Sequence, residues 1–276
     1  MNPLVSVVIP TYNRPGPLCE LIECLFRQTH KNIEIIIVND NGEKVDFIKE
    51  LYPELKILIL DMSSNVKHVT ARNAGVSAAS GTYIMLCDDD DLVVPTHITT
   101  MLSEISEFEM VYSDVEIVEF ITEGRTRIPA KRSLFAYEYD LEAMRSFSTF
   151  IPSGCLYLRD IHTKIGMFDE NVYHYWDWDF FLRVSDKFRI KRVPVAGTLY
   201  AFASGGDNLS EGLSSMEPYL NQLSKKHDLG KLPTRNFFLL LEEPKVKERR
   251  SESNIIWDGQ PVVSRWSLVE EGGTGL

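Results

Sequence analysis

The sequence lacks a long apolar run and a basic leader. Its longest apolar stretches, such as residues 57–60 and 237–241, fall far short of the roughly 20 residues that a membrane-spanning helix needs. The N-terminus has no positively charged segment followed by an apolar one, as a signal peptide would have. We therefore expect a cytoplasmic protein without a transmembrane segment.

Basic residues are also in deficit. The 276 residues include 29 Lys and Arg against 40 Asp and Glu, which gives a net charge of −11. Proteins bind nucleic acids largely by neutralising phosphates with Lys and Arg, so this balance predicts no nucleic-acid partner. With 44% hydrophobic and 25% charged residues, the composition is that of a globular protein that can build a core.

Cysteine is scarce, and its spacing excludes two kinds of site. The sequence has no Cys-x-x-Cys pair, no metal-type spacing with His and no dense disulfide framework. We expect reduced thiols that are mostly buried. The four cysteines are Cys19, Cys24, Cys87 and Cys155.

What the first half does contain is an alternation of strand and helix patterns. Four short apolar runs rich in β-branched residues, at 4–9, 33–38, 55–60 and 83–87, are typical of strands buried on both faces of a parallel sheet. Between the first two runs, apolar residues recur with helical spacing after Pro15. Small residues at 71–80 predict a second helix that packs closely on the sheet. Residues 1–115 therefore read as an α/β half with a Rossmann-like winding.

The second half is less regular, and its pattern is mixed. We expect a charged loop at 122–134, a mobile loop at 204–215 and a loosely attached tail at 242–276. The predicted strands cover residues 115–121, 155–158 and 190–195, and the predicted helices cover 160–165, 177–185 and 216–227.

Polar residues follow the predicted strands of the first half, at the sheet edge where open α/β proteins bind ligands. They are Thr11, Tyr12, Asn13 and Arg14 after the first strand, Asn39 and Asp40 after the second, and Asp88 to Asp91 after the fourth. Asp40 is either the turn residue of an Asn-Asp-Asn-Gly sequence or an acceptor for a base or ribose group.

Four adjacent aspartates repel one another unless a cation or hydrogen-bond donors compensate them. Oxygen ligands with few protein carboxylates suit Mg²⁺ or Mn²⁺ that bridges to a diphosphate. The alternative is that Asp88 to Asp91 only cap the helix that begins after Pro95, and one or two of them are expected to do so.

Four motifs follow one another along the chain: VSVVIPTYNR at 5–14, VNDNG at 38–42, ARNAGVSAASGTYIMLCDDDD at 71–91, and IGMFDE at 165–170 followed by WDWDFFLR at 176–183. With these motifs in the expected order, residues 4–210 resemble family 2 glycosyltransferases, which have the GT-A fold. The fold that this resemblance implies is α/β, with a Rossmann-like, mostly parallel central sheet flanked by helices and a less regular C-terminal extension.

The resemblance implies a metal-dependent, inverting transfer of a sugar from a nucleoside diphosphate-sugar, with UDP the favoured nucleotide. The acceptor would be the hydroxyl of a saccharide or a lipid-linked molecule, in cell-surface polysaccharide or glycoconjugate synthesis. Peripheral membrane contact is compatible with it. The cation would be Mn²⁺ or Mg²⁺, held mainly by Asp90 with Asp88. The nucleotide-sugar site would contain Pro10, Thr11, Tyr12, Asn13, Arg14, Asp40, Arg72, Asp88 and Asp89.

In the family, the catalytic base is the aspartate of a Glu-Asp pair that opens a helix. Asp177 takes that position, but Trp176 stands where the family usually has Glu. The acceptor contacts are assigned to Trp176 and Gly154. Without the resemblance, Asp177 and Asp179 would be read as charges that complement the helix dipole, and Trp176 and Trp178 as core residues.

The domain organisation expected on this basis has three parts. Residues 1–115 form the nucleotide-sugar-binding half, 116–228 the acceptor-binding half of the same domain, and 229–276 an extension. Two other functions stay open: a nucleotidyltransferase, and a catalytically silent protein that binds sugar nucleotides. The sequence PTYNRPG is a poor phosphate-binding loop, which disfavours the first, and Asp88, Asp90 and Asp177 disfavour the second.

Overall fold

A computed structural model describes residues 2–202 and 213–269. The strands within them are β1 (Val5–Thr11), β2 (Ile33–Asn39), β3 (Ile57–Asp61), β4 (Tyr83–Leu86), β5 (Leu92–Val93), β6 (Met110–Glu123), β7 (Thr126–Phe135), β8 (Cys155–Leu158), β9 (Ile190–Phe202) and β10 (Asn254–Ile255). The helices are α1 (Pro15–Phe26), α2 (Phe47–Leu51), α3 (Lys67–Ala78), α4 (His97–Glu104), α5 (Leu141–Met144), α6 (Ile161–Ile165), α7 (Trp176–Ser185), α8 (Leu213–His227), α9 (Phe237–Leu241) and α10 (Pro244–Lys247). Short 3₁₀ turns lie at η1 (Pro152–Gly154), η2 (Glu170–Tyr175) and η4 (Trp266–Leu268).

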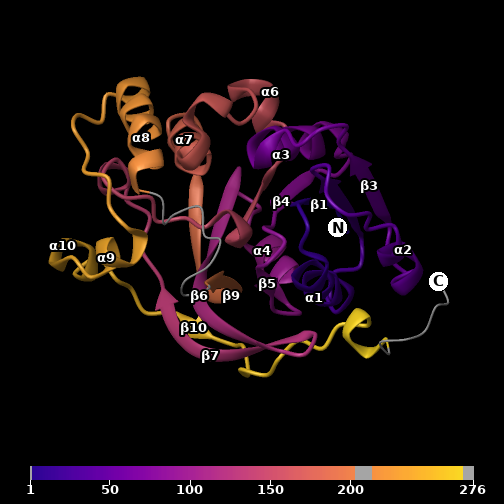
Figure 1. Cartoon of the computed structure of the whole chain (residues 1–276). Coiled ribbons are helices and arrows are strands. Elements are labelled where there is room, and N and C mark those ends of the chain that lie inside the picture. The colour runs from indigo at the N-terminus through magenta and orange to yellow at the C-terminus, as the bar shows by residue number, and fades with distance from the viewer. Residues whose placement is uncertain (1, 203–212, 270–276) are drawn as a thin grey trace.

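One mixed sheet organises the molecule. Its strand order is β10-β9-β6-β8-β4-β1-β2-β3, with β5 paired to β9 and β7 paired to β6 (Figure 1). Strands β3, β2, β1 and β4 are parallel, β8 is antiparallel to β4 and β6, and β9 runs parallel to β6. The carboxyl ends of β1, β2 and β4 therefore meet at one edge of the sheet, as expected for the α/β half.

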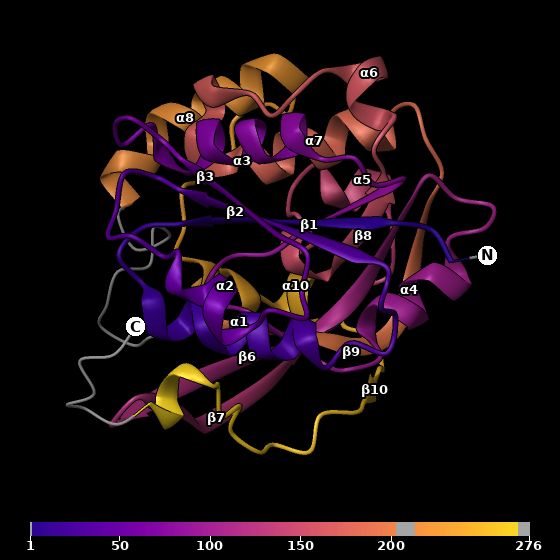
Figure 2. The ribbon, with the colours of Figure 1, turned by 90° about the vertical axis from the view of Figure 1, so that its right-hand side faces the viewer.

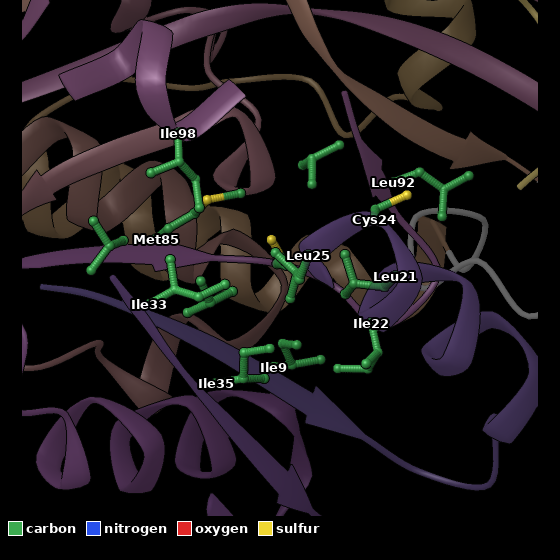
Figure 3. Packing of buried hydrophobic residues seen from close by; sticks show 14 of the residues in the cluster. Ile9, Leu21, Ile22, Cys24, Leu25, Ile33, Ile35, Met85, Leu92 and Ile98 are labelled. Atoms are coloured by element: carbon green, nitrogen blue, oxygen red, sulfur yellow. The ribbon is translucent and has the colours of Figure 1, made fainter. Parts of the chain in front are cut away.

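Helices cover both faces of the sheet. Figure 2 shows α1, α2 and α4 on one side of it and α3, α7 and α8 on the other. The strands alternate in the same way: Val7 and Ile9 of β1 pack beneath α1, whereas Val8 packs with α3. Figure 3 shows the first of these cores, where Leu21, Ile22 and neighbouring residues of α1 meet the sheet. Nearly continuous apolar runs form β1 and β2 because both of their faces are buried.

Most of the predicted elements are present, but the predicted loop at 122–134 is wrong. These residues form the end of β6, a turn at Gly124 with φ of +59°, and most of β7. Its basic residues are tolerated in a strand because they form ion pairs across the hairpin. Arg132 binds Glu116, and Lys131 lies 3.1 Å from Glu119. Cross-strand ion pairs therefore allow a polar segment to be a strand.

The C-terminal tail is attached more firmly than expected, as far as residue 269. It runs from β10 beneath β7 toward α1 (Figure 1). Trp266 packs on the first core at Gly16, and the Arg132 guanidinium lies 4.5 Å from the Trp257 ring centroid. Arg265 stacks on Phe26 at 4.4 Å. Most of the predicted mobile loop, residues 204–212, lies outside the described residues, and α8 begins at Leu213.

Two further expectations concern the cysteines and membrane spans. All four cysteines are free and buried, which confirms the prediction of unpaired, buried thiols. Within the described residues, none of the helices combines the length and the apolar character that crossing a bilayer requires.

Close packing of α3 on the sheet yields a testable prediction. A Cβ added at Gly75 would lie 2.4 Å from Val8 Cγ1 and 3.0 Å from Val38 Cγ2. Gly75→Ala should therefore lower the free energy of unfolding by about 1–3 kcal/mol, the usual cost of overpacking a core. Ser77→Ala, on the exposed side of the same helix, is the control and should change it by less than about 0.5 kcal/mol in urea denaturation. An unchanged Gly75→Ala midpoint would show that the helix can shift freely.

Candidate active site

A cavity of about 480 Å³ lies at the carboxyl ends of β1, β2 and β4, and it gathers most of the predicted site residues. It is also lined by residues of the second half, including Phe150, Tyr200 and Phe237. The predicted site residues that line it are Pro10, Thr11, Tyr12, Arg14, Asp40, Arg72, Asp88, Asp89, Asp90, Trp176 and Asp177.

Two predicted site residues do not line this cavity. Asn13 has a left-handed backbone with φ of +54°, and its side-chain oxygen accepts a hydrogen bond from the Glu43 amide at 2.8 Å. It shapes the turn after β1 instead of facing the cavity. Gly154 is buried in η1, where an added Cβ would lie 3.0 Å from Ser113 Oγ. The acceptor contact predicted for Gly154 is therefore not found in the cavity, because close packing behind it fills that position.

The aspartates after β4 are compensated by arginines and hydroxyls from other elements. Arg72 of α3 pairs with Asp88, and Arg14 Nη1 lies 2.7 Å from Asp90 Oδ2. Asp89 accepts a hydrogen bond from Thr11 Oγ1 at 2.7 Å. None of the four aspartates caps α4, whose N-cap is Thr96 and makes no side-chain cap hydrogen bond. The expected capping role is therefore wrong. Asp88, Asp89 and Asp90 line the cavity instead, and Asp91 is bound inside the protein.

Asp91 differs from its neighbours because it is directed into the protein. It is 1% exposed, and it accepts hydrogen bonds from Ser153 Oγ at 2.5 Å and the Ala201 amide at 2.9 Å. Burial, with the charges of Asp90 and Asp88, raises its pKa well above the usual value. Asp91 therefore ties the aspartate segment to η1 and β9, and it does not line the cavity.

The cavity aspartates have raised pKa values as well. Burial, followed by the charge of Asp90, raises the pKa of Asp89 to about 7 despite the opposing effect of Arg14. Burial and the charge of Asp88 also raise the pKa of Asp90. Burial thus disfavours the ionised forms of Asp89 and Asp90, and a bound cation would lower these pKa values.

Asp88 and Asp90 fit a divalent cation whose remaining ligands come from a bound substrate. Within residues 2–202 and 213–269, no group of three His, Cys, Asp or Glu side chains is arranged to hold a metal ion by itself. Mg²⁺ usually takes one or two carboxylates and completes its shell with water and phosphate oxygens. Asp88 and Asp90 offer two carboxylates on the cavity wall, which suits this mode.

Arg72 is held by a cluster that the sequence did not reveal. Its guanidinium lies 4.3 Å from the Trp176 ring centroid, and its Nη1 is 2.7 Å from His68 Nδ1. Burial, with the charge of Arg72, lowers the pKa of His68 to about 2, so this imidazole is neutral and accepts the hydrogen bond. Tyr173 packs edge-on against His68 at 4.3 Å. His68 could have been found from its position four residues before Arg72, because residues four apart are neighbours on a helix. That spacing is informative only if both residues are known to lie in α3.

Asp40 holds the start of α3. Its two carboxylate oxygens accept hydrogen bonds from the Val66 amide at 2.6 Å and the Lys67 amide at 2.9 Å. The Lys67 backbone has φ of +71°, an uncommon conformation for a side chain other than glycine. Asp40 is thus more than a turn residue, and it still faces the cavity with its remaining lone pairs.

Asp177 and Asp179 lie in the first turn of α7 but in different surroundings. Asp177 lines the cavity, where Oδ1 accepts a hydrogen bond from the Trp178 amide at 2.8 Å. Burial, with a smaller contribution from Asp88, raises the pKa of Asp177 to about 6. Asp179 is 0% exposed and contacts Arg183, Lys226 and His227. Burial alone would raise its pKa, but these partners outweigh burial and lower it to about 2.

The two tryptophans of α7 also differ. Trp178 is 8% exposed, and its Nε1 donates a hydrogen bond to the Met144 carbonyl at 2.8 Å, so it is a core residue. Trp176 is 6% exposed but lines the cavity beneath Arg72. Trp176 therefore supports Arg72, and the glutamate that the family usually has there would not provide an aromatic surface for that guanidinium.

Arg127 of β7 is another residue that the sequence did not reveal. Its Nη1 donates to the Asp90 carbonyl at 2.8 Å, and its Nε donates to Glu20 Oε2 at 2.6 Å. Arg127 and Glu20 are both largely buried. The hairpin thereby fixes the backbone of Asp90 relative to α1. Arg127 was missed because its segment was predicted to be a loop.

Comparisons with known proteins match this chain to a glycosyltransferase family. The model of the family described as "Glycosyl transferase family 2" matches residues 6–166. An uncharacterized glycosyltransferase of Bacillus subtilis, YwdF, is 54% identical over 95% of this chain and 98% of its own length. The amylovoran biosynthesis glycosyltransferase AmsB of Erwinia amylovora is 28% identical over 70% of this chain and 67% of its own.

Solved structures confirm the predicted GT-A fold. Residues 1–349 of TarS from S. aureus, in complex with UDP-GlcNAc, align with a TM-score of 0.64 at 17% identity, over 80% of this chain and 66% of that one. The mannosyltransferase PcManGT from Pyrobaculum calidifontis, in complex with GDP-Man and Mn²⁺, aligns with a TM-score of 0.60 at 16% identity, over 84% and 66%.

The contrast between the two aspartates of α7 can be tested through stability. Asp179→Ala should destabilise the protein by about 3 kcal/mol, the low end for losing a buried ion pair, because it leaves the partly exposed Arg183 and Lys226 without their buried counter-ion. Asp177→Asn is the control, and it should unfold at a denaturant concentration no lower than the wild type, since burial disfavours the Asp177 charge.

The pH dependence of unfolding gives a second readout of the same contrast. Since the pKa of Asp179 is lowered from 3.8 to about 2 on folding, its contribution is present above pH 4 and is lost as the pH falls toward 2. An Asp179→Ala variant as stable as the wild type at pH 7 would contradict this role.

Proposed function

The chain belongs to glycosyltransferase family 2, and on that premise we propose that its cavity transfers a sugar from a nucleoside diphosphate-sugar to an acceptor hydroxyl with inversion. The observation that carries this proposal is the meeting of Asp88, Asp90 and Asp177 with Arg14 and Arg72 around one cavity. UDP is the proposed nucleotide, and a saccharide or lipid-linked molecule of a cell-surface polysaccharide or glycoconjugate is the proposed acceptor. The UDP-GlcNAc complex of TarS supports this choice of donor class.

The nucleoside is assigned to the segment after β1 together with Asp40. Tyr12 is 49% exposed and presents a ring beside Pro10 and Thr11, on which a base can stack. Asp40 lies on the cavity wall with lone pairs that can accept hydrogen bonds from a base or ribose. Residues 1–115 are thus proposed to form the donor half.

The acceptor is assigned to the wall that residues 116–228 supply, where Phe150 and Trp176 face the cavity. Phe237 of α9 belongs to the proposed extension, 229–276, and also lines the cavity. The extension is therefore proposed to complete the acceptor side.

The leaving diphosphate requires positive charge. Mn²⁺ or Mg²⁺, held by the carboxylates of Asp90 and Asp88, would supply part of it when bound. Arg14, which pairs with Asp90, and Arg72, which pairs with Asp88, would supply the rest. Both arginines are near the carboxylates, so they offset charge that develops on the diphosphate as its bond to the sugar breaks.

The acceptor needs a base, and Asp177 is proposed for this role. The acceptor oxygen forms a bond to C1 of the sugar as the bond from C1 to the diphosphate breaks on the opposite face, and the hydroxyl proton passes to the Asp177 carboxylate. One displacement with one base inverts the configuration at C1. A pKa of about 6 leaves Asp177 mostly ionised at neutral pH and more basic than an ordinary aspartate.

Donor binding tests the metal assignment. Asp90→Ala should abolish Mn²⁺-dependent binding of UDP, because it removes the carboxylate proposed as the main ligand, while the thermal unfolding of the protein without UDP stays cooperative. Asp186→Ala, at the exposed end of α7, is the control and should bind as the wild type does. Calorimetric titration of UDP with and without Mn²⁺ measures both. Unchanged metal-dependent binding in Asp90→Ala would refute the assignment.

Turnover tests the base. Asp177→Asn should slow sugar transfer by ~10² or more, the usual contribution of a positioned base, while UDP and Mn²⁺ bind almost normally. Since the carboxylate must be ionised, the wild-type rate should fall as the pH drops through about 6, and the residual rate of Asp177→Asn should lack that fall.

The same assay separates the rival functions. Release of nucleoside diphosphate from a donor supports transfer, release of pyrophosphate supports a nucleotidyltransferase, and neither product supports a silent binding protein. A wild-type transfer rate in Asp177→Asn would show that another residue is the base.

A further inference from the structure

The charge of the chain is unevenly distributed. Residues 225–250 hold eight Lys and Arg against four Asp and Glu, a net charge of +4, although the whole chain has −11. The other 250 residues therefore carry −15. The basic segment comprises the end of α8, α9, α10 and the chain between them, which Figure 1 shows along one side of the molecule. We call it the basic face.

The basic face borders the cavity on its proposed acceptor side. Met216 of α8 and Phe237 of α9 both line the cavity. The last turn of α8 carries Lys225 and Lys226, and α9 lies in the chain between Arg235 and Lys245, so the basic segment is continuous with two elements of the cavity wall. Acidic residues neutralise part of this charge. Within the segment Arg235 pairs with Glu243, and Lys247 and Arg250 pair with Glu242. Lys226 pairs with Asp169 and Asp179 outside it. The basic residues that are exposed are Lys225, Lys226, Lys231, Arg235, Lys245, Lys247 and Arg250.

The same segment holds an exposed apolar side chain. Leu239 of α9 is 69% exposed, one of the highest exposures among the large apolar residues of the described chain. Its neighbours are anchored inward: the Phe238 ring lies 4.0 Å from that of Phe202, and Phe237 lies 5.8 Å from Phe135. Val246 of α10 is buried in the same cluster. Leu239 is therefore presented outward on a fixed base.

An anionic bilayer attracts a segment of this composition in two ways. Its lipid headgroups bind basic side chains, and an exposed apolar side chain can enter the boundary between headgroups and acyl chains. We propose that the basic face docks on an anionic lipid bilayer and so brings the acceptor wall of the cavity to the membrane. The acidic remainder of the chain is repelled by the same surface, which orients the molecule. Docking does not depend on the proposed function. The consequence that the acceptor is lipid-linked does depend on it.

Vesicle sedimentation with the full chain tests the docking. The protein should sediment with phosphatidylcholine vesicles that contain phosphatidylglycerol and not with pure phosphatidylcholine, and the binding should weaken strongly between about 0.1 and 0.5 M NaCl. The double variant Lys231→Glu with Lys245→Glu should lose about tenfold or more in partitioning. Its matched control, Lys49→Glu with Lys187→Glu, changes the net charge equally at exposed sites outside the basic face and should keep wild-type partitioning.

Leu239→Ser separates a bilayer from a soluble polyanion. It should weaken vesicle binding several-fold, and inorganic polyphosphate should not displace the wild type from vesicles at equal charge concentration. The proposal is overturned by failure to sediment at low salt, by equal loss in the control variant, or by polyphosphate displacement together with an unaffected Leu239→Ser variant. Calorimetric binding of UDP in the same variants reports on the proposed function separately, because these residues lie outside the donor half.

Discussion

The carboxylates after β4 are the constraint around which the structure is arranged. Neighbouring aspartates at a partly buried sheet edge are stable only if cations and hydrogen-bond donors reach them. Those groups come from distant parts of the chain: Arg14 follows β1, Arg72 lies on α3, and Arg127 lies on β7. Three different elements therefore each supply one arginine to the same cluster of aspartates.

The need to compensate these aspartates accounts for three features of the structure: the β6–β7 hairpin, Trp176 and the packing of the tail. The β6–β7 hairpin is long enough to bring Arg127 to the Asp90 carbonyl, where Glu20 of α1 holds its other side. Trp176 replaces the glutamate usual in the family and places an aromatic ring beneath Arg72. The tail then packs Trp266 on Gly16, close in sequence to Arg14. The supports of the aspartate segment thus extend well beyond the residues that line the cavity.

The sequence was informative where local pattern and burial agree, and uninformative where tertiary pairing decides. Strands β1, β2, β3 and β4 can be recognised in the sequence as apolar runs because they belong to a parallel sheet that is covered by helices. The aspartates and Arg14 were located because strand ends meet at one edge. Strand β7 was missed because its charged residues are satisfied only by residues of β6 and α1. The packing of the tail was not predicted either, because isolated tryptophans form no periodic pattern in the sequence.

Asp177 and Asp179 show what position in a sequence cannot settle. Both lie in the first turn of α7, but two residues turn the helix by about 200°, so one carboxylate faces the cavity and the other faces α8. There Asp179 gains partners that lower its pKa, whereas for Asp177 burial outweighs the Trp178 amide and the charge of Arg72, so its pKa is raised. Folding thus stabilises the ionised form of Asp179 and disfavours that of Asp177. Asp177 is thus a carboxylate kept at a cost to stability on the wall of a cavity lined by two arginines and four further carboxylates, which is the property that the proposed base requires. Asp179, already paired with Arg183, Lys226 and His227, lacks that property.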